Sequence, residues 1–170
     1  MKKVLVLFIV VFCLAQSALA VSYVEFAGGY NAAAAKAKDR FDTGAWPSVK
    51  RFGSGDDQSC EAKFSKSLVS ATLQMNKNND VTDVNVMGKT KNHAGFMRVV
   101  DHALSAYAPQ LSTSEKSEAI KRAKLNDKVF LKEARGGVNG FFQEIEYKGI
   151  VFMTAAGIQP GDMGVSFWKK

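Results

Sequence analysis

Two runs of alternating apolar and polar residues, separated by a short polar segment, most constrain the fold of this chain. In residues 63–75, apolar side chains recur at every second position from Val69 to Met75. Residues 81–88 repeat the pattern, and the Asn- and Asp-containing segment 76–80 between the runs has the composition of a turn. Because neighbouring side chains of a strand point to opposite faces, a period of two indicates strands with one buried face. The sequence therefore predicts an antiparallel hairpin.

The C-terminal third continues with the same kind of pattern. Residues 141–157 form two runs rich in apolar residues, and Lys148 with Gly149 between them offers a tight turn. A Pro-Gly turn follows, and residues 165–168 then form one more short strand. These three runs predict a three-stranded antiparallel meander.

Three segments have helical patterns. Apolar residues recur three and four positions apart from Phe96 to Tyr107, which is typical of an amphipathic helix. Residues 112–126 begin with Ser112 and a glutamate three residues later, which predicts a capping box at the start of a second helix. The alanine-rich segment 31–41 predicts a short third helix, and two glycines shortly before it should break any earlier helix. Grouped strands and grouped helices predict an α+β domain, an antiparallel sheet with two to three helices packed on it.

The first 20 residues have the three-part pattern of a secretory signal peptide. Two lysines precede an unbroken apolar run at residues 4–15, and small residues lead to a cleavage site after Ala20. That run is too short to cross the roughly 30 Å core of a bilayer as a helix, and an uncleaved anchor is the alternative reading. We therefore expect export across the inner membrane, to the periplasm or the extracellular space.

The remaining residues, 21–170, have the length of a single domain. Residues 42–61 are rich in Gly, Ser and Asp without periodicity, which predicts a long loop. No other segment is long and apolar enough to span a membrane, so we expect no transmembrane span in the mature chain. The formal net charge of +7 is spread along the sequence, which favours solubility over nucleic-acid binding. Affinity for anionic envelope polymers is a second reading of this charge.

Cys60 is the one cysteine outside the predicted signal peptide, so the mature chain can form no internal disulfide. Its thiol has three interpretations: an inert buried group, a disulfide to a second copy that makes a dimer, or a nucleophile with His102 as its base. His93 and His102 are nine residues apart, and about 100° per residue puts them on opposite sides of one helix. They therefore predict two separate surface or boundary histidines rather than a metal site.

Glu144 and Glu146 lie two positions apart and should share one face of a strand, roughly 7 Å apart. That spacing is used by the carboxylate pairs of enzymes that hydrolyse sugars. A charged strand face exposed to solvent explains the same pattern. The sequence has no nucleophile elbow, no phosphate-binding loop and no cofactor signature.

Aromatic residues gather in the C-terminal third. Neighbours on a strand point to opposite faces, so Phe142 and the phenylalanine before it cannot enter the same core, and neither can Phe167 and Trp168. Either a second layer from the N-terminal helix and the Trp46 segment covers the other face, or some of these rings are exposed. Exposed rings near basic residues suit a partner surface. The binding residues that we predict are Phe142, Phe167, Trp168 and Lys169.

Together these features predict an exported, non-enzymatic binding or accessory module that recognises a protein or an envelope component. The first alternative is a small hydrolase that uses Cys60 with His102, or Glu144 with Glu146. The second is a carrier for a small apolar ligand bound between the sheet and the helices. The leading interpretation includes neither a metal nor a cofactor.

Overall fold

A computed structural model describes most of the chain after the predicted signal peptide, and residues 1–19 lie outside the described part. The described residues are 20–37, 46, 50–53, 58–64, 68–136, 140–157 and 159–170. The helices are α2 (Tyr23–Ala37), the 3₁₀ turn η1 (Thr90–Asn92), α3 (His93–Tyr107), α4 (Thr113–Arg122) and α5 (Lys128–Ala134). The strands are β1 (Val21–Ser22), β2 (Lys50–Phe52), β3 (Gln58–Phe64), β4 (Val69–Met75), β5 (Asp80–Lys89), β6 (Phe141–Tyr147), β7 (Ile150–Ala156) and β8 (Asp162–Lys169).

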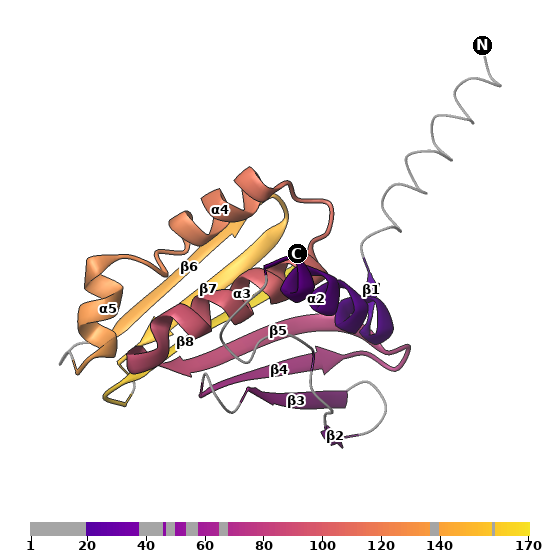
Figure 1. The fold of residues 1–170 in the computed structure, drawn as a ribbon, viewed down its shortest axis with the longest axis horizontal. Coiled ribbons are helices and arrows are strands. Elements are labelled where there is room, and N and C mark those ends of the chain that lie inside the picture. Colours follow the sequence, from indigo (N-terminus) through magenta and orange to yellow (C-terminus); the bar gives the residue numbers. More distant parts are fainter. Residues whose placement is uncertain are drawn as a thin grey trace, which may run out of the picture.

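The described strands belong to one antiparallel sheet. Its strand order is β2-β3-β4-β5-β8-β7-β6, and β1 pairs with β5 (Figure 1). The predicted hairpin is confirmed as β4 and β5, and the predicted meander as β6, β7 and β8. Pairing of β5 with β8 joins the two parts and places Val84 opposite Phe167 and Val86 opposite Val165. The α+β class with an antiparallel sheet is therefore confirmed.

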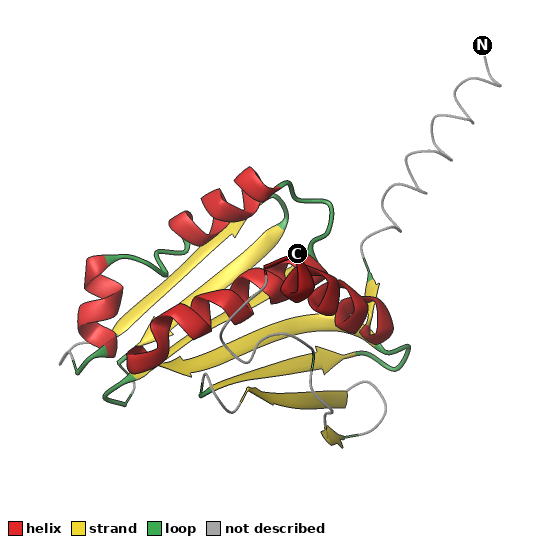
Figure 2. Cartoon of the chain, viewed as in Figure 1, coloured by secondary structure: helices red, strands yellow, loops and turns green. Residues whose placement is uncertain are grey.

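The described helices all lie on one face of this sheet (Figure 2). The apolar stripe of α3 from Phe96 to Tyr107 is buried and rests on β4 and β5, while α2 crosses α3. The segment with α4 and α5 covers β6 and β7, where the Thr154 hydroxyl donates a hydrogen bond to the Ala123 carbonyl at 3.0 Å. The hydrophobic core thus lies between the sheet and a single layer of helices.

The start of α4 confirms the predicted capping box. The Ser112 hydroxyl accepts a hydrogen bond from the Glu115 N–H, and the Glu115 carboxylate accepts one from the Ser112 N–H at 2.8 Å. Glu115 also pairs at 2.8 Å with Lys148, which occupies the β6–β7 turn with a φ of 54°. The hydrogen bond from Lys148, together with those from Ser112, lowers the pKa of Glu115 to about 2. These contacts tie α4 to the C-terminal meander.

The prediction of a long loop at residues 42–61 is wrong for residues 50–52 and 58–61, and residues 42–45, 47–49 and 54–57 lie outside the described part of the chain. Strand β2 occupies Lys50–Phe52, and β3 begins at Gln58, so Cys60 lies inside a strand rather than before one. Cys60, Ala62 and Phe64 are all buried and alternate with more exposed residues. This period of two was present in the sequence, but the loop-like residues before it obscured where the strand begins.

The structure has four described α-helices, where two to three were predicted. Helix α2 begins at Tyr23 and continues through Gly28 and Gly29, where we expected a break. Helix α5 was not predicted; it follows Asp127, whose carboxylate accepts a hydrogen bond from the Val129 N–H at 2.7 Å. Along the described ranges, no helix combines the length and the apolar character that a membrane span requires.

Candidate functional site

The face of the sheet opposite the helices has none of the described helices over it, and we call it the open face (Figure 2). On β3 and β4 its side chains are polar, as at Glu61 and Thr72. Toward β5, β8, β7 and β6 it becomes apolar, and this apolar part consists of Met87, Val151, Met153, Ala155, Trp168 and Phe142. Phe142 is 68% exposed and Met87 is 40% exposed. Single exposed apolar side chains are common on proteins, so the informative feature is that Phe142 and Met87 belong to one apolar part of the face.

A shallow hollow of about 300 Å³ lies within this apolar part. Met87 and Met153 line it, together with Ala155 and Gly164, whose small size leaves the backbone accessible. A Cβ atom at Gly164 would lie 2.5 Å from the Met87 sulfur, so the thioether rests directly on the glycine. Asn85 also lines the hollow, and its side-chain oxygen is buried with no hydrogen-bond partner in the described part of the chain. No local sequence pattern marks these residues as a site, because only the pairing of β5, β7 and β8 brings them together.

The four predicted binding residues divide between the two faces of the sheet. Phe142 and Trp168 lie on the open face, and cross-strand pairing puts Trp168 opposite Asp83 and Val151. Phe167 is fully buried on the helix face, where its ring lies 5.6 Å from that of Tyr107.

Lys169 also lies apart from the exposed aromatic rings, whereas Lys170 pairs with Glu146 of the open face. Lys169 extends over the Tyr107 ring, with its ammonium 5.0 Å from the ring centroid, and burial lowers the pKa of Lys169. Only Phe142 and Trp168 of the predicted set therefore share the open face.

We offered two interpretations of the aromatic pairs, and one of them is wrong: the N-terminal helix and Trp46 do not form a second layer over the open face. Trp46 is buried on the helix side, where its ring lies 5.1 Å from the rings of both Phe26 and Tyr30 and 6.0 Å from Phe64. Helix α2 and Trp46 therefore thicken the existing helix layer. The open face keeps its apolar side chains without cover from any described element.

Acidic side chains border the apolar part of the open face. Asp83 is partly buried beside Trp168, and this burial raises the pKa of the Asp83 carboxyl. Glu144 and Glu146 share the open face of β6, as their spacing predicts, and both are exposed. Glu146 pairs with Lys170 at 2.8 Å. The two glutamates thus stand on an exposed strand at the edge of the described sheet rather than facing each other across a cleft.

Cys60 and His102 are both buried, and they come from different elements. Cys60 lies on β3 opposite Leu73, and its thiol is closed off from solvent. His102 lies on α3, with its ring edge-on to Tyr30 of α2 at 5.5 Å and its Nδ1 3.9 Å from the Asp101 carboxylate. The expectation of a surface or boundary position for His102 is wrong, because α2 covers that side of α3. A disulfide between two copies through Cys60 would require the core to open at β3, because the side chain is fully buried, and the dimer stays a prediction.

His93 is separate from His102 and has a structural contact. It begins α3, and its Nε2 lies 3.0 Å from the carbonyl oxygen of Leu125. Within the described ranges, no group of three or more His, Cys, Asp or Glu side chains is placed to hold a metal ion.

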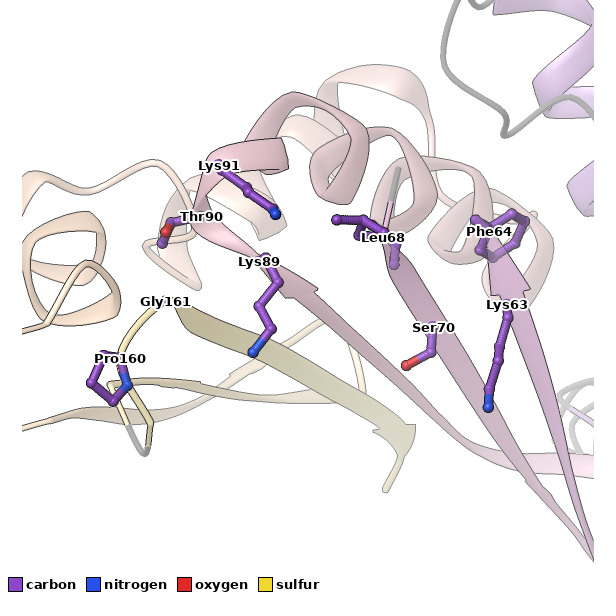
Figure 3. A pocket seen from close by; sticks show the side chains of 10 residues that line it. Lys63, Phe64, Leu68, Ser70, Lys89, Thr90, Lys91, Pro160 and Gly161 are labelled. Carbon is purple, nitrogen blue, oxygen red and sulfur yellow. The ribbon is translucent and has the colours of Figure 1, made fainter. Parts of the chain in front are cut away.

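A second cavity, of about 680 Å³, lies at the end of the sheet where β4 begins (Figure 3). We call it the lysine notch; its lining residues are Lys63, Phe64, Leu68, Val69, Ser70, Lys89, Thr90, Lys91, Pro160 and Gly161. The lysines come from β3, from the end of β5 and from η1. No local sequence pattern connects these three lysine positions, so the notch is visible only in the folded chain.

Comparisons with protein-family models, with curated proteins and with solved structures found no match. The fold therefore defines a class, an α+β protein whose antiparallel sheet carries helices on one face, and the function must be argued from the surfaces of the molecule.

Proposed function

We propose that this chain is an exported, non-enzymatic binding or accessory module that recognises a protein of the cell envelope through the apolar part of its open face. The observation that carries the proposal is the exposure of Phe142 and Met87 beside a hollow, on a sheet face without a described helix. Contiguous exposed apolar side chains with a polar border are characteristic of interaction surfaces. Methionine suits such a surface because its flexible thioether adapts to the partner.

The hydrolase alternatives have less support. Cys60 is fully buried, whereas a nucleophile must reach its substrate. Glu144 and Glu146 are both exposed, and Glu146 is already paired with Lys170. A carboxyl group that acts as a general acid needs a pKa raised by a protected environment, which an exposed strand does not supply. Export to the periplasm or beyond remains a proposal that rests on the N-terminal sequence.

The proposal is tested by capture of partners from a cell-envelope extract with a tagged form of the protein. We expect Phe142→Glu to abolish capture of a protein that the unaltered chain retains, because a charge replaces a largely exposed apolar ring within the contact. Trp168→Ala should weaken the same capture. The matched control is Val129→Glu, which places the same charge at a position 56% exposed on the helix side.

Two results would contradict the proposal. One is equal capture by the Phe142→Glu and Val129→Glu variants; the other is no protein enriched above a matrix without the tagged chain. An enzyme would instead show turnover of a substrate that Glu146→Gln or Cys60→Ser removes, with partner capture unchanged by Phe142→Glu.

A further inference from the structure

We propose that the lysine notch binds an anionic amphiphile, meaning a molecule with one apolar chain that ends in a carboxylate or a phosphate. The notch, at about 680 Å³, falls within the roughly 300–1,000 Å³ range of small-molecule sites. It differs in place and in charge from the hollow on the open face. The inference does not depend on the proposed function, and either one can fail without the other.

The space arises from a difference in strand length. Pairing between β4 and β5 ends at Ser70 and Met87, whereas β5 continues to pair with β8 as far as Lys89 opposite Asp162. The last residues of β5 therefore have no described strand on their β4 side. The β7–β8 turn at Gly161 closes the far end, where the Thr90 N–H donates a hydrogen bond to the Gly161 carbonyl at 2.9 Å.

Leu68 supplies an apolar surface that solvent can reach. Its side chain is 49% exposed and lies between Lys91 and Phe64 in Figure 3. Its backbone has a φ of 51°, a left-handed conformation that leucine rarely adopts. Phe64 and Val69 also line the cavity and are almost fully buried. The β3–β4 turn therefore holds an exposed apolar side chain at the mouth of the cavity, where a ligand could bury it.

Three lysines line the cavity: Lys91 lies beside Leu68, whereas Lys63 and Lys89 extend on the open-face side of β3 and β5 (Figure 3). None of the described lining residues is acidic. Lys89 forms an ion pair with Asp162 of β8. Lys91 has no acidic partner within the described ranges. Lys63 lies 3.4 Å from Glu61, but its side chain is largely exposed, and such surface pairs contribute little. Lys63 and Lys91 can therefore bind an added anion without breaking a strong contact.

Because the notch presents both an apolar surface at Leu68 and lysine ammonium groups, it favours a ligand that has both an apolar chain and an anionic head group. An uncharged apolar chain would bury Leu68 but would bring nothing to the ammonium groups, which would lose water on its arrival. A small anion would meet the ammonium groups but would leave the leucine in water. Lysine binds carboxylate and phosphate as a point charge without a fixed geometry, so the notch does not discriminate strongly between the two head groups. The experiment therefore includes both.

The test uses protein purified after expression of the full chain in an exporting Gram-negative host. It is titrated with dodecanoate and with dodecyl phosphate, each below its micelle concentration, by calorimetry. We expect one equivalent of either amphiphile to bind, and 1-dodecanol and inorganic phosphate to bind at least about ten-fold more weakly, since each lacks one of the two contacts. Amide NMR shifts should change at Leu68, Ser70 and Lys91.

Two variants test the apolar contact at Leu68 and the charged contact at Lys91 one at a time, and their melting temperatures show whether the fold is kept. Leu68→Gly should weaken dodecanoate binding about ten-fold by removing apolar contact, while its melting temperature stays the same or rises, because glycine adopts a φ of 51° without strain. Lys91→Gln should weaken it about five-fold or more by removing a charge-assisted contact. The control is Lys77→Gln, at an exposed position after β4. Its affinity for dodecanoate should stay within about two-fold of that of the unaltered protein, since distant surface charges are screened.

Three results would overturn the proposal. They are equal affinity for 1-dodecanol and dodecanoate, unchanged affinity in both Leu68→Gly and Lys91→Gln, and NMR changes confined to the open face around Met87 and Met153. Failure of any amphiphile to bind at concentrations below its micelle threshold would overturn it as well.

Discussion

Tyr107, at the end of α3, connects a helix to two strands through one hydroxyl group. That hydroxyl donates a hydrogen bond to the Thr82 carbonyl of β5 at 2.9 Å and accepts one from the Lys169 N–H of β8 at 3.0 Å. The side chain is almost fully buried, and burial raises the pKa of Tyr107 to about 12. One residue of α3 therefore hydrogen-bonds to both strands of the β5–β8 junction, which joins the two halves of the sheet.

Tyr107→Phe should lower the free energy of unfolding by about 1–3 kcal/mol, because the Thr82 carbonyl and the Lys169 N–H lose a buried partner while the ring is kept. Urea unfolding at pH 7 measures this change. Tyr147→Phe is the control, because no hydrogen bond of the Tyr147 hydroxyl occurs in the described part of the chain and its contact with the Arg122 guanidinium uses the ring. Its effect should stay within about 0.5 kcal/mol.

The difference in unfolding free energy between the unaltered protein and Tyr107→Phe should depend on pH. The pKa of Tyr107 rises from 10 in the unfolded chain to about 12 in the folded one. The contribution of the neutral hydroxyl to the free energy of unfolding is therefore complete below pH 10 and is lost as the pH rises to 12. The stability difference between the unaltered protein and Tyr107→Phe should therefore shrink by roughly 2 kcal/mol over this interval. A difference that stays constant from pH 9 to pH 12 would contradict the burial of this hydroxyl.

At the scale of elements, α2 shows how a tertiary contact can override a local preference. Two glycines near its middle favour a break, yet the helix continues through them. A Cβ atom on Gly29 would lie 3.1 Å from the Ala106 Cα and 3.4 Å from its Cβ, so the glycine allows α2 and α3 to approach closely. A Cβ atom on Gly28 would have no neighbour within 4 Å. The two glycines therefore have different roles.

Gly28→Ala should raise the free energy of unfolding by about 1 kcal/mol, since alanine is the better helix former and its methyl group meets open space. Gly29→Ala should lower it by about 1 kcal/mol or more, because the backbone of α3 cannot move without disturbing the core. Thermal and urea unfolding of the two variants, made side by side, measure the difference. Equal effects from both substitutions would mean that α2 and α3 do not approach each other at Gly29.

The elements that the sequence predicts are those specified by residues close together in the chain. The β4–β5 hairpin has its alternation and turn within one segment, and the capping box of Ser112 and Glu115 spans four residues. β3 has the same alternation at Cys60, but Gly-, Ser- and Asp-rich residues precede it, so its start was read as loop. α5 is only seven residues long, too short for helical periodicity to distinguish it from a loop.

At the scale of the whole molecule, the candidate surfaces depend on contacts that no local pattern contains. Alternation shows that Phe167 and Trp168 point to opposite faces, but which of them is buried depends on which face carries the helices. The pairing of β5 with β8 across some 80 residues brings Met87 onto Gly164 and creates the hollow. Likewise, the notch exists because β4 stops short of the end of β5. The sequence contains the residues of both sites but not the strand order that assembles them.

Because helices cover only one face of the sheet, substitutions at Phe167 and Phe142 should have very different effects on the free energy of unfolding. The sequence alone predicted both as binding residues. Phe167→Ala should lower the free energy of unfolding by about 3–5 kcal/mol, because the ring is fully buried against Tyr107 and Phe152. Phe142→Ala should change it by no more than about 0.5 kcal/mol, because most of that ring is already in water. Urea unfolding of both variants at micromolar concentration provides the comparison. A loss of several kcal/mol from Phe142→Ala would mean that something covers the open face in solution, and a dependence of that loss on protein concentration would identify the cover as a second copy of the chain.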